Sequence, residues 1–220
     1  MQIQTNNSFP VLVKQLIPDE SVRKSLSNLQ SSQRTWKSEG WGRITNDIVQ
    51  DASLANGRVD SSFWELIFDC AKFNFGETAL PSYWKWCRYS PTYGTPNIPP
   101  HIDINACTYT IDLQLDGNID WEIFVDGIPY MMQNGDALLY LGSDQFHWRP
   151  KCPTSNRKSF LEMCFIHFVE PDHWYHTKGK EWIDSDEVRL PWRERMLELL
   201  PKYKCDTYRP FEDPEDFPGY

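Results

Sequence analysis

The chain has 220 residues, of which 15% are aromatic, and its formal net charge at pH 7 is −9. The length predicts a single domain, and the high aromatic content excludes a chain that is largely disordered. Because the charge is acidic and no run of lysine and arginine is present, we expect no nucleic-acid partner.

Residues 1–80 are expected to support a core that lies further along the chain. A short strand is predicted at 11–13 and a helix over 19–29, where acidic residues and a serine are typical of a helix start. The polar segment 31–60 shows no sustained period, so we expect it to be irregular. A clearer helix follows, because apolar residues recur at helical spacing: Phe63, Trp64, Ile67, Phe68 and Ala71. This stripe is predicted to pack against a sheet.

Residues 81–170 are predicted to form a core of β-strands. The alternating segment 83–89 indicates a strand, and the prolines between 91 and 100 favour a loop after it. From 107 to 115, apolar residues alternate with polar ones, a pattern typical of a strand with one buried face.

The second half of this core is divided by strong turn signals. Asp126-Gly127 is typical of a two-residue hairpin, and the apolar segments 137–141 and 160–169 indicate further strands. Short strands that follow one another through turns, with no helix between them, predict an antiparallel sandwich or barrel.

Residues 171–220 have a different character. Apolar residues between 184 and 200 predict a late helix that Pro191 either interrupts or starts, and the proline-rich acidic segment 210–220 is expected to be a surface tail. We therefore expect residues 1–220 to form one domain, with support at 1–80, a core at 81–170, and a helix and tail at 171–220.

The cellular location is predicted from segments that the sequence lacks. No apolar run approaches the roughly 20 residues of a membrane helix, and the first seven residues lack the pattern of a signal peptide. The six cysteines are widely spaced and match no CxxC pattern. We expect a cytoplasmic protein with reduced thiols and no membrane partner.

His101, Asp103 and His147 are the candidate metal ligands. On an extended strand, residues two apart project to the same face, so His101 and Asp103 can reach one ion together. His147 follows several strands later, and a rolled sheet would bring it near the pair. Two histidines and one carboxylate leave open coordination positions, as in non-haem Fe(II) oxygenases. A plain alternative is that His101 and Asp103 form a hydrogen-bonded pair in solvent.

Arg157 and Ser159 are candidates for an anion site beside the metal. They share the parity of Leu161, Met163 and Phe165, so we expect all five side chains to face the barrel interior. A guanidinium inside an apolar barrel is costly unless an anion meets it, and its planar fork matches a carboxylate. The alternative is a surface arginine paired with an acid.

Three further residues near this pattern could contribute to a site. Trp148 and Arg149 follow His147 directly and are candidates for the substrate rim. His167 has the parity of Arg157, so it is either a core histidine or a residue of the far pocket.

These motifs resemble those of the Fe(II)/2-oxoglutarate-dependent dioxygenase superfamily, in its prolyl-4-hydroxylase-like branch. The resemblance is carried by the HxD pair, the distal histidine, the RxS segment ten residues after it, and the segment 134–140 that precedes His147-Trp148. It covers about residues 85–170. It implies a mainly β fold with flanking helices, the double-stranded β-helix (jelly-roll, cupin-like).

The resemblance also implies roles for particular residues. His101, Asp103 and His147 would be catalytic and bind Fe(II), at which O₂ reacts. Arg157 would bind the distal carboxylate of the co-substrate 2-oxoglutarate, assisted by Ser159 and by a tyrosine. The tyrosine candidates are Tyr89 and Tyr109, of which Tyr109 is favoured because its parity matches the apolar face. Many prolyl hydroxylases carry lysine in place of Arg157, which puts a prolyl substrate in doubt.

The expected activity is hydroxylation of an unactivated C–H bond in an amino-acid, peptide or small-molecule substrate. Two alternatives stay open. The first is a metal-binding cupin-type isomerase or epimerase that works without O₂. The second is a non-catalytic jelly-roll binding module, in which the ligand atoms would not converge.

Overall fold

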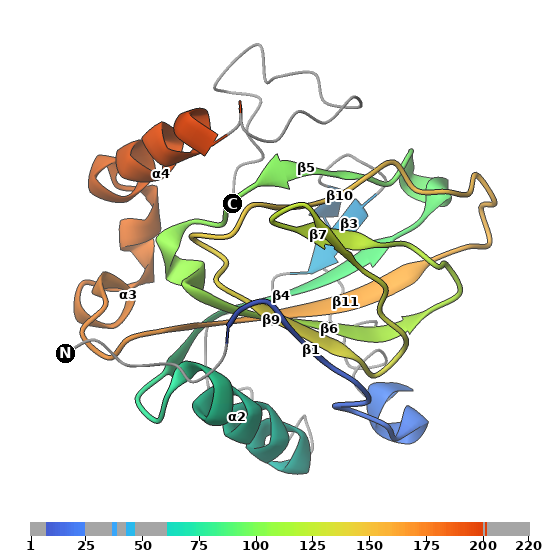
Figure 1. Ribbon diagram of the computed structural model, residues 1–220, viewed down its shortest axis with the longest axis horizontal. Coiled ribbons are helices and arrows are strands. Elements are labelled where there is room, and N and C mark those ends of the chain that lie inside the picture. Colours follow the sequence, from blue (N-terminus) through green and yellow to red (C-terminus); the bar gives the residue numbers. More distant parts are fainter. Residues whose placement is uncertain (1–7, 25–36, 39–42, 47–60, 200, 202–220) are drawn as a thin grey trace.

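Two antiparallel β-sheets face each other and enclose a core between them (Figure 1). The computed structural model describes residues 8–24, 37–38, 43–46, 61–199 and 201. The larger sheet has the order β1-β9-β6-β11-β4-β3-β2. Its strands are β1 (Val11–Val13), β2 (Lys37–Ser38), β3 (Arg43–Asn46), β4 (Leu80–Tyr89), β6 (Tyr109–Gly117), β9 (Ala137–Tyr140) and β11 (Leu161–Val169).

The smaller sheet provides the other wall. Its order is β5-β10-β7-β8, with β5 (Ile98–His101), β7 (Ile123–Val125), β8 (Ile128–Tyr130) and β10 (His147–Arg149). The hairpin between β7 and β8 turns at Asp126 and Gly127, whose φ angles are 50° and 82°. Positive φ at both central residues is the geometry that the Asp-Gly pair predicted.

Helix α2 (Ser61–Phe75) covers the outer face of the larger sheet (Figure 1). Phe63, Ile67, Ala71 and Phe75 are at most 1% exposed and lie on one face of the helix. Phe75 stacks on the ring of Tyr109 in β6, with 5.0 Å between ring centroids. The predicted packing of this helix on a sheet is confirmed.

Strand β6 differs from its prediction because both of its faces are buried. The apolar face, with Ile111 and Leu113, packs beneath α2. The polar face, with Thr110 and Asp112, is also buried and belongs to the barrel interior, where Asp112 lines a pocket. The predicted alternation of the two faces is therefore correct. The face that points into the barrel, however, is the polar face and not the apolar one.

The proline-rich segment before His101 is not only a loop. After the short 3₁₀ helix η2 (Pro91–Tyr93), strand β5 contains Pro99 and Pro100 and still pairs with β10. Among the described strands, β5 is at the edge of the smaller sheet, so a residue without an N–H is tolerated there.

The expectation of an irregular segment over 31–60 is wrong where the structure describes it, since β2 and β3 join the larger sheet beside β4. The rest of that segment lies outside the described residues. So do the end of the helix predicted over 19–29, which is helical from Glu20 to Lys24, and the tail at 210–220.

The C-terminal part folds against the end of β5. The 3₁₀ helix η3 (Asn105–Cys107) lies between β5 and β6, and α3 (Trp174–Thr177) and the 3₁₀ helix η4 (Lys180–Asp184) lead to α4 (Asp186–Leu199), the predicted late helix. Met196 and Leu199 of α4 pack with Ile102 and Phe146.

Two further observations concern the helices and the cysteines. In the described part of the chain, no helix combines the length and the apolar character that crossing a bilayer requires. The five cysteines that the structure describes are free thiols, and Cys205 lies outside the described residues.

Candidate metal centre and its pocket

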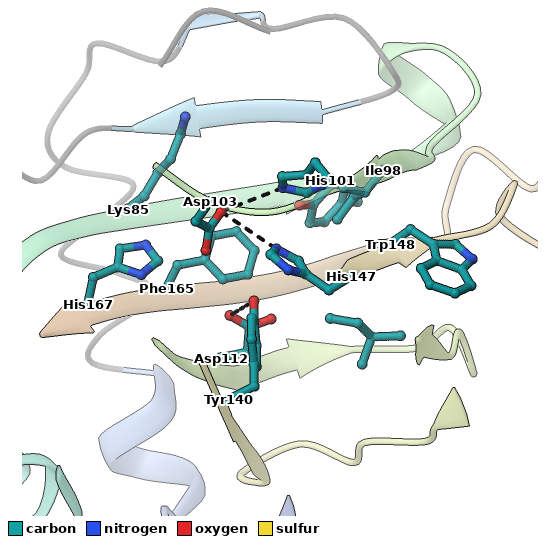
Figure 2. A pocket seen from close by; sticks show the side chains of 12 residues that line it. Lys85, Ile98, His101, Asp103, Asp112, Tyr140, His147, Trp148, Phe165 and His167 are labelled. Atoms are coloured by element: carbon teal, nitrogen blue, oxygen red, sulfur yellow. Dashed lines mark hydrogen bonds and ion pairs between the residues drawn. The ribbon is translucent and has the colours of Figure 1, made fainter. Parts of the chain in front are cut away.

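His101, Asp103 and His147 converge on one point in the barrel. His101 ends β5 and His147 begins β10, and the two residues are direct partners in the ladder between these strands. The Oδ1 atom of Asp103 lies 3.6 Å from Nε2 of His101 and 3.5 Å from Nε2 of His147 (Figure 2). Ligand atoms at this spacing can surround one divalent ion at bond lengths of about 2.0–2.2 Å after a small contraction.

The two imidazole rings are oriented by the backbone. Nδ1 of His101 lies 2.8 Å from the carbonyl oxygen of Pro99, and Nδ1 of His147 lies 2.9 Å from that of Gln145. A carbonyl can only accept a hydrogen bond, so each Nδ1 carries a proton, and a neutral ring then presents the lone pair of Nε2 to the shared point. Metal-ligating histidines in proteins are commonly held in this way.

The charges around the candidate metal centre favour the ionised form of Asp103. In the metal-free site, burial opposes the charged form of Asp103, but the charge of a protonated His147 and the contacts with both histidines hold its pKa well below the usual value. Burial lowers the pKa of His101, and His147 lowers it further. For His147, burial is outweighed by Asp103, so its pKa is raised. Asp103 is therefore available as an anionic ligand.

The centre opens into a pocket between the two sheets. Its empty space is about 450 Å³, part of which is open solvent at the mouth. Figure 2 shows Asp112 and Tyr140 facing the three candidate ligands, His167 and Lys85 on one side and Trp148 on the other. The lining residues are Lys85, Tyr89, Ile98, His101, Asp103, Asp112, Ile123, Tyr140, His147, Trp148, Phe165 and His167.

Asp112 is a pocket residue that sequence reasoning missed. It is 1% exposed, and Tyr140 donates a hydrogen bond to its Oδ1 at 3.2 Å. Burial raises the pKa of Asp112 to about 7, against smaller opposing effects of His147 and Arg149. The available signal was an aspartate in the middle of an apolar strand, which we had assigned to the solvent face.

Arg157 does not face the interior, and that prediction is wrong. It is exposed, in a turn with Lys158, four residues before β11 begins. Leu161 and Met163 do pack in the core between the sheets, as predicted. Parity does not extend through a turn, because the alternation of faces holds only while the backbone stays extended. Ser159 is buried, and its carbonyl accepts a hydrogen bond from Ser90.

The two candidate tyrosines lie in different parts of the structure. Tyr89 is fully buried and lines the pocket. Tyr109, which was favoured, lies on the opposite face of β6, where its hydroxyl donates to Glu170 at 2.6 Å and its ring stacks on Phe75. It is not a pocket residue, because the apolar face of β6 is the face beneath α2.

The buried arginine of the barrel is Arg149. It is 1% exposed, and its Nη1 donates to the carbonyl of Trp121, over whose ring the guanidinium lies at 5.3 Å. Its Nε has no hydrogen-bond partner, and among the described residues no carboxylate pairs with it. Burial lowers the pKa of Arg149, while the nearby Tyr89 and Asp112 raise it. Both of these residues line the pocket, so the guanidinium lies behind its wall.

Comparison with known proteins defines the class of fold. The chain has the double-stranded β-helix fold of 2-oxoglutarate- and Fe(II)-dependent oxygenases, as predicted, and prolyl hydroxylases are among its structural neighbours. No protein-family model matches the sequence, and no curated protein matches it either. The resemblance is therefore one of structure, at low sequence identity.

Three solved structures illustrate the resemblance. The epimerase SnoN, in complex with Fe³⁺, α-ketoglutarate and nogalamycin RO, is 12% identical with a TM-score of 0.58, over 91% of this chain and 88% of that chain. A 2OG-Fe(II) oxygenase from Burkholderia pseudomallei is 11% identical with a TM-score of 0.56, over 73% and 84%. A prolyl-4-hydroxylase from Pseudomonas putida is 10% identical with a TM-score of 0.52, over 73% and 92%.

Proposed function

We propose that this protein is an Fe(II)- and 2-oxoglutarate-dependent dioxygenase that hydroxylates a C–H bond of an amino-acid, peptide or small-molecule substrate. The observation that carries the proposal is the convergence of His101, Asp103 and His147 in a pocket backed by Arg149. The class of substrate rests on the fold.

The residues fit the metal that the fold implies. Two imidazole nitrogens and one carboxylate oxygen leave about three positions of an octahedral Fe(II) open, enough for a chelating oxo acid and O₂. When bound, Fe(II) and 2-oxoglutarate would supply the oxidising chemistry, in which the oxo acid is decarboxylated to succinate. The protein orients the imidazoles, keeps Asp103 ionised, and surrounds the site with buried side chains.

Arg149 is the residue we assign to the far carboxylate of 2-oxoglutarate. Its planar fork matches a carboxylate, and a buried cation without an acidic partner is costly unless an anion reaches it. Its Nη2 lies 3.8 Å from the sulfur of Met163 in β11, so the guanidinium reaches from β10 toward the strand that follows Arg157. Lys85 lines the pocket directly, whereas Arg149 lies behind its wall, but Lys85 is on the far side of Asp103, beside His167 (Figure 2).

Trp148 is the candidate for contact with the substrate. It lines the pocket, is partly exposed, and stacks on Phe124 with 5.1 Å between ring centroids. Together with Ile98 it makes the side of the pocket beyond His147 apolar (Figure 2). An apolar portion of the substrate is therefore expected to lie on this side.

The test is Fe(II)-dependent formation of succinate from 2-oxoglutarate, with Asp103→Ala as the inactive control. We expect Arg149→Met to raise the KM for 2-oxoglutarate at least tenfold, because a charge-assisted bidentate pair is lost. Arg157→Ala, which removes a surface arginine, is expected to leave the KM unchanged. Equal rates for wild type and Asp103→Ala would overturn the proposal.

Two further outcomes refine the result. A raised KM in Lys85→Met but not in Arg149→Met would transfer the anchoring role to Lys85. A metal-dependent change of a substrate with no succinate formed would favour the isomerase or epimerase that works without O₂. Mass analysis of the product separates hydroxylation, which adds one oxygen atom, from epimerisation, which adds none.

A further inference from the structure

The two oxygens of Asp103 have different surroundings. Oδ1 faces the Nε2 atoms of His101 and His147, as the distances above show. Oδ2 points the other way and accepts a hydrogen bond from the hydroxyl of Thr110 at 3.4 Å. Thr110 is fully buried on β6, so this contact is closed to solvent.

A second hydrogen bond joins Thr110 to His167 on the neighbouring strand of the larger sheet. Oγ1 of Thr110 lies 3.0 Å from Nδ1 of His167 on β11. A hydroxyl has one hydrogen, so when Thr110 donates to Asp103 the imidazole must donate to Thr110 from Nδ1. Burial lowers the pKa of His167 to about 4, so the ring is neutral. Its plane lies nearly parallel to that of Tyr83, 5.9 Å away between centroids, which limits its rotation.

The hydroxyl of Thr110 has three acceptors within reach. The carbonyl oxygen of Cys107 and Oδ2 of Asp103 both lie at 3.4 Å, and Nδ1 of His167, at 3.0 Å, accepts in the tautomer that is protonated at Nε2. The carboxylate is the strongest of the three acceptors because it is charged. We therefore assign the hydrogen of the hydroxyl to Asp103.

The backbone at Gly142 closes the space on the same side of Asp103. The carbonyl of Gly142 accepts the backbone N–H of Asp103 at 2.8 Å. A Cβ at this position would lie 2.6 Å from Oδ2 of Asp103 and would overlap Thr110. The carboxylate is thus bordered by a glycine that approaches it too closely for any side chain.

We propose that His167 and Thr110 form a hydrogen-bond relay that holds Asp103 as a one-oxygen metal ligand. The relay rests on the proposed function, since it acts on the ligand set of the metal. Without it, Oδ2 could turn toward the ion and occupy a coordination position. Only two positions would then remain, too few for a chelating oxo acid and O₂ together. His167 and Thr110 are positioning residues, because neither belongs to the ligand set itself.

The experiment counts water ligands on Mn(II) bound to the full-length protein, by water-proton relaxation and without co-substrate. We expect three exchangeable waters in the wild type and two in Thr110→Val, which keeps the side-chain shape but lacks the hydroxyl. Thr110→Ser should restore three. His167→Leu should behave like Thr110→Val, and His167→Asn, whose amide can donate from the position of Nδ1, should restore the third water.

The outcomes separate the relay from the proposed function. An equal water count in wild type, Thr110→Val and His167→Leu, with unchanged thermal unfolding, would overturn the relay. Loss of Mn(II) binding in the wild type would overturn the metal centre and the relay together. If the counts differ as expected but 2-oxoglutarate displaces no water from the wild type, the relay stands and the assigned co-substrate is wrong.

Discussion

At the scale of single residues, Asp112 is the group whose chemistry depends most on its surroundings. It is fully buried beside Tyr140, and burial raises its pKa to about 7 from an ordinary value of 3.8. A carboxyl with a raised pKa holds its proton in the folded state after the unfolded chain has released it. Its contribution to stability is therefore complete below about pH 4 and is lost as the pH rises through 7.

This titration predicts the behaviour of Asp112→Asn in metal-free protein. The amide does not ionise, so the variant should gain stability relative to wild type as the pH rises from 5 to 8. A shift of this size corresponds to a gain on the order of 2–4 kcal/mol. Urea unfolding at pH 5, 6, 7 and 8 in the presence of a chelator measures it. Asp120→Asn, at an exposed position, is the matched control variant, and a flat difference for Asp112→Asn would contradict the raised pKa.

Single residues also show where sequence reasoning ends. His101, Asp103 and His147 could be found because ligand chemistry restricts the residue types and strand geometry explains the spacing. Arg157 was placed inside by parity across a turn, whereas Arg149 faces the interior from within a strand. The deciding quantity, burial, depends on tertiary packing that a local pattern does not contain.

At the scale of elements, α4 supports the segment that carries the candidate metal ligands His101 and Asp103. Trp192 donates from Nε1 to the carbonyl of Ile102 at 2.9 Å, and the N–H of Ile102 points to the sulfur of Met196 at 3.1 Å. Ile102 lies between His101 and Asp103, so both polar groups of its backbone are held by one helix. The position of this helix sets the direction in which the two ligands leave the strand.

Replacing Trp192 with phenylalanine should therefore weaken metal binding. The change removes one hydrogen bond, worth about 1 kcal/mol, or about fivefold in the Kd for Mn(II). Leu197→Ala, at a side chain of α4 that is 56% exposed, is the matched control and should leave the Kd unchanged. Titration calorimetry measures both. An unchanged Kd in Trp192→Phe would mean that α4 only covers the end of the barrel.

The elements themselves were predicted with uneven success. The helices α2 and α4, the hairpin at Asp126-Gly127 and strand β11 have strong local signals, and the structure contains them. Strand β5 was missed because its prolines argue against a ladder, and only its place at a sheet edge permits them. The sequence could not predict which face of β6 points into the barrel. Both faces are buried, so no exposed face distinguishes one from the other.

At the scale of the whole molecule, the candidate metal ligands lie where two neighbouring parts of the smaller sheet meet. His101 and Asp103 come from the end of β5 and the segment after it, and His147 comes from the start of β10. The described strands of this sheet are only three or four residues long, so its ladders are short. An ion shared by these ligands would connect β5 to β10 at the point where the pocket opens.

Metal binding should therefore stabilise the entire fold. The unfolded chain cannot present the three ligands together, so an ion at 100 times its Kd adds about 2.7 kcal/mol, which raises the Tm of a domain of this size by about 5–11 °C. Differential scanning calorimetry with and without Mn(II) measures the shift, and a chelator should reverse it. The shift should disappear in His147→Ala and persist in His176→Ala, which alters an exposed histidine. A shift of the same size in both variants would place the ion elsewhere in the molecule.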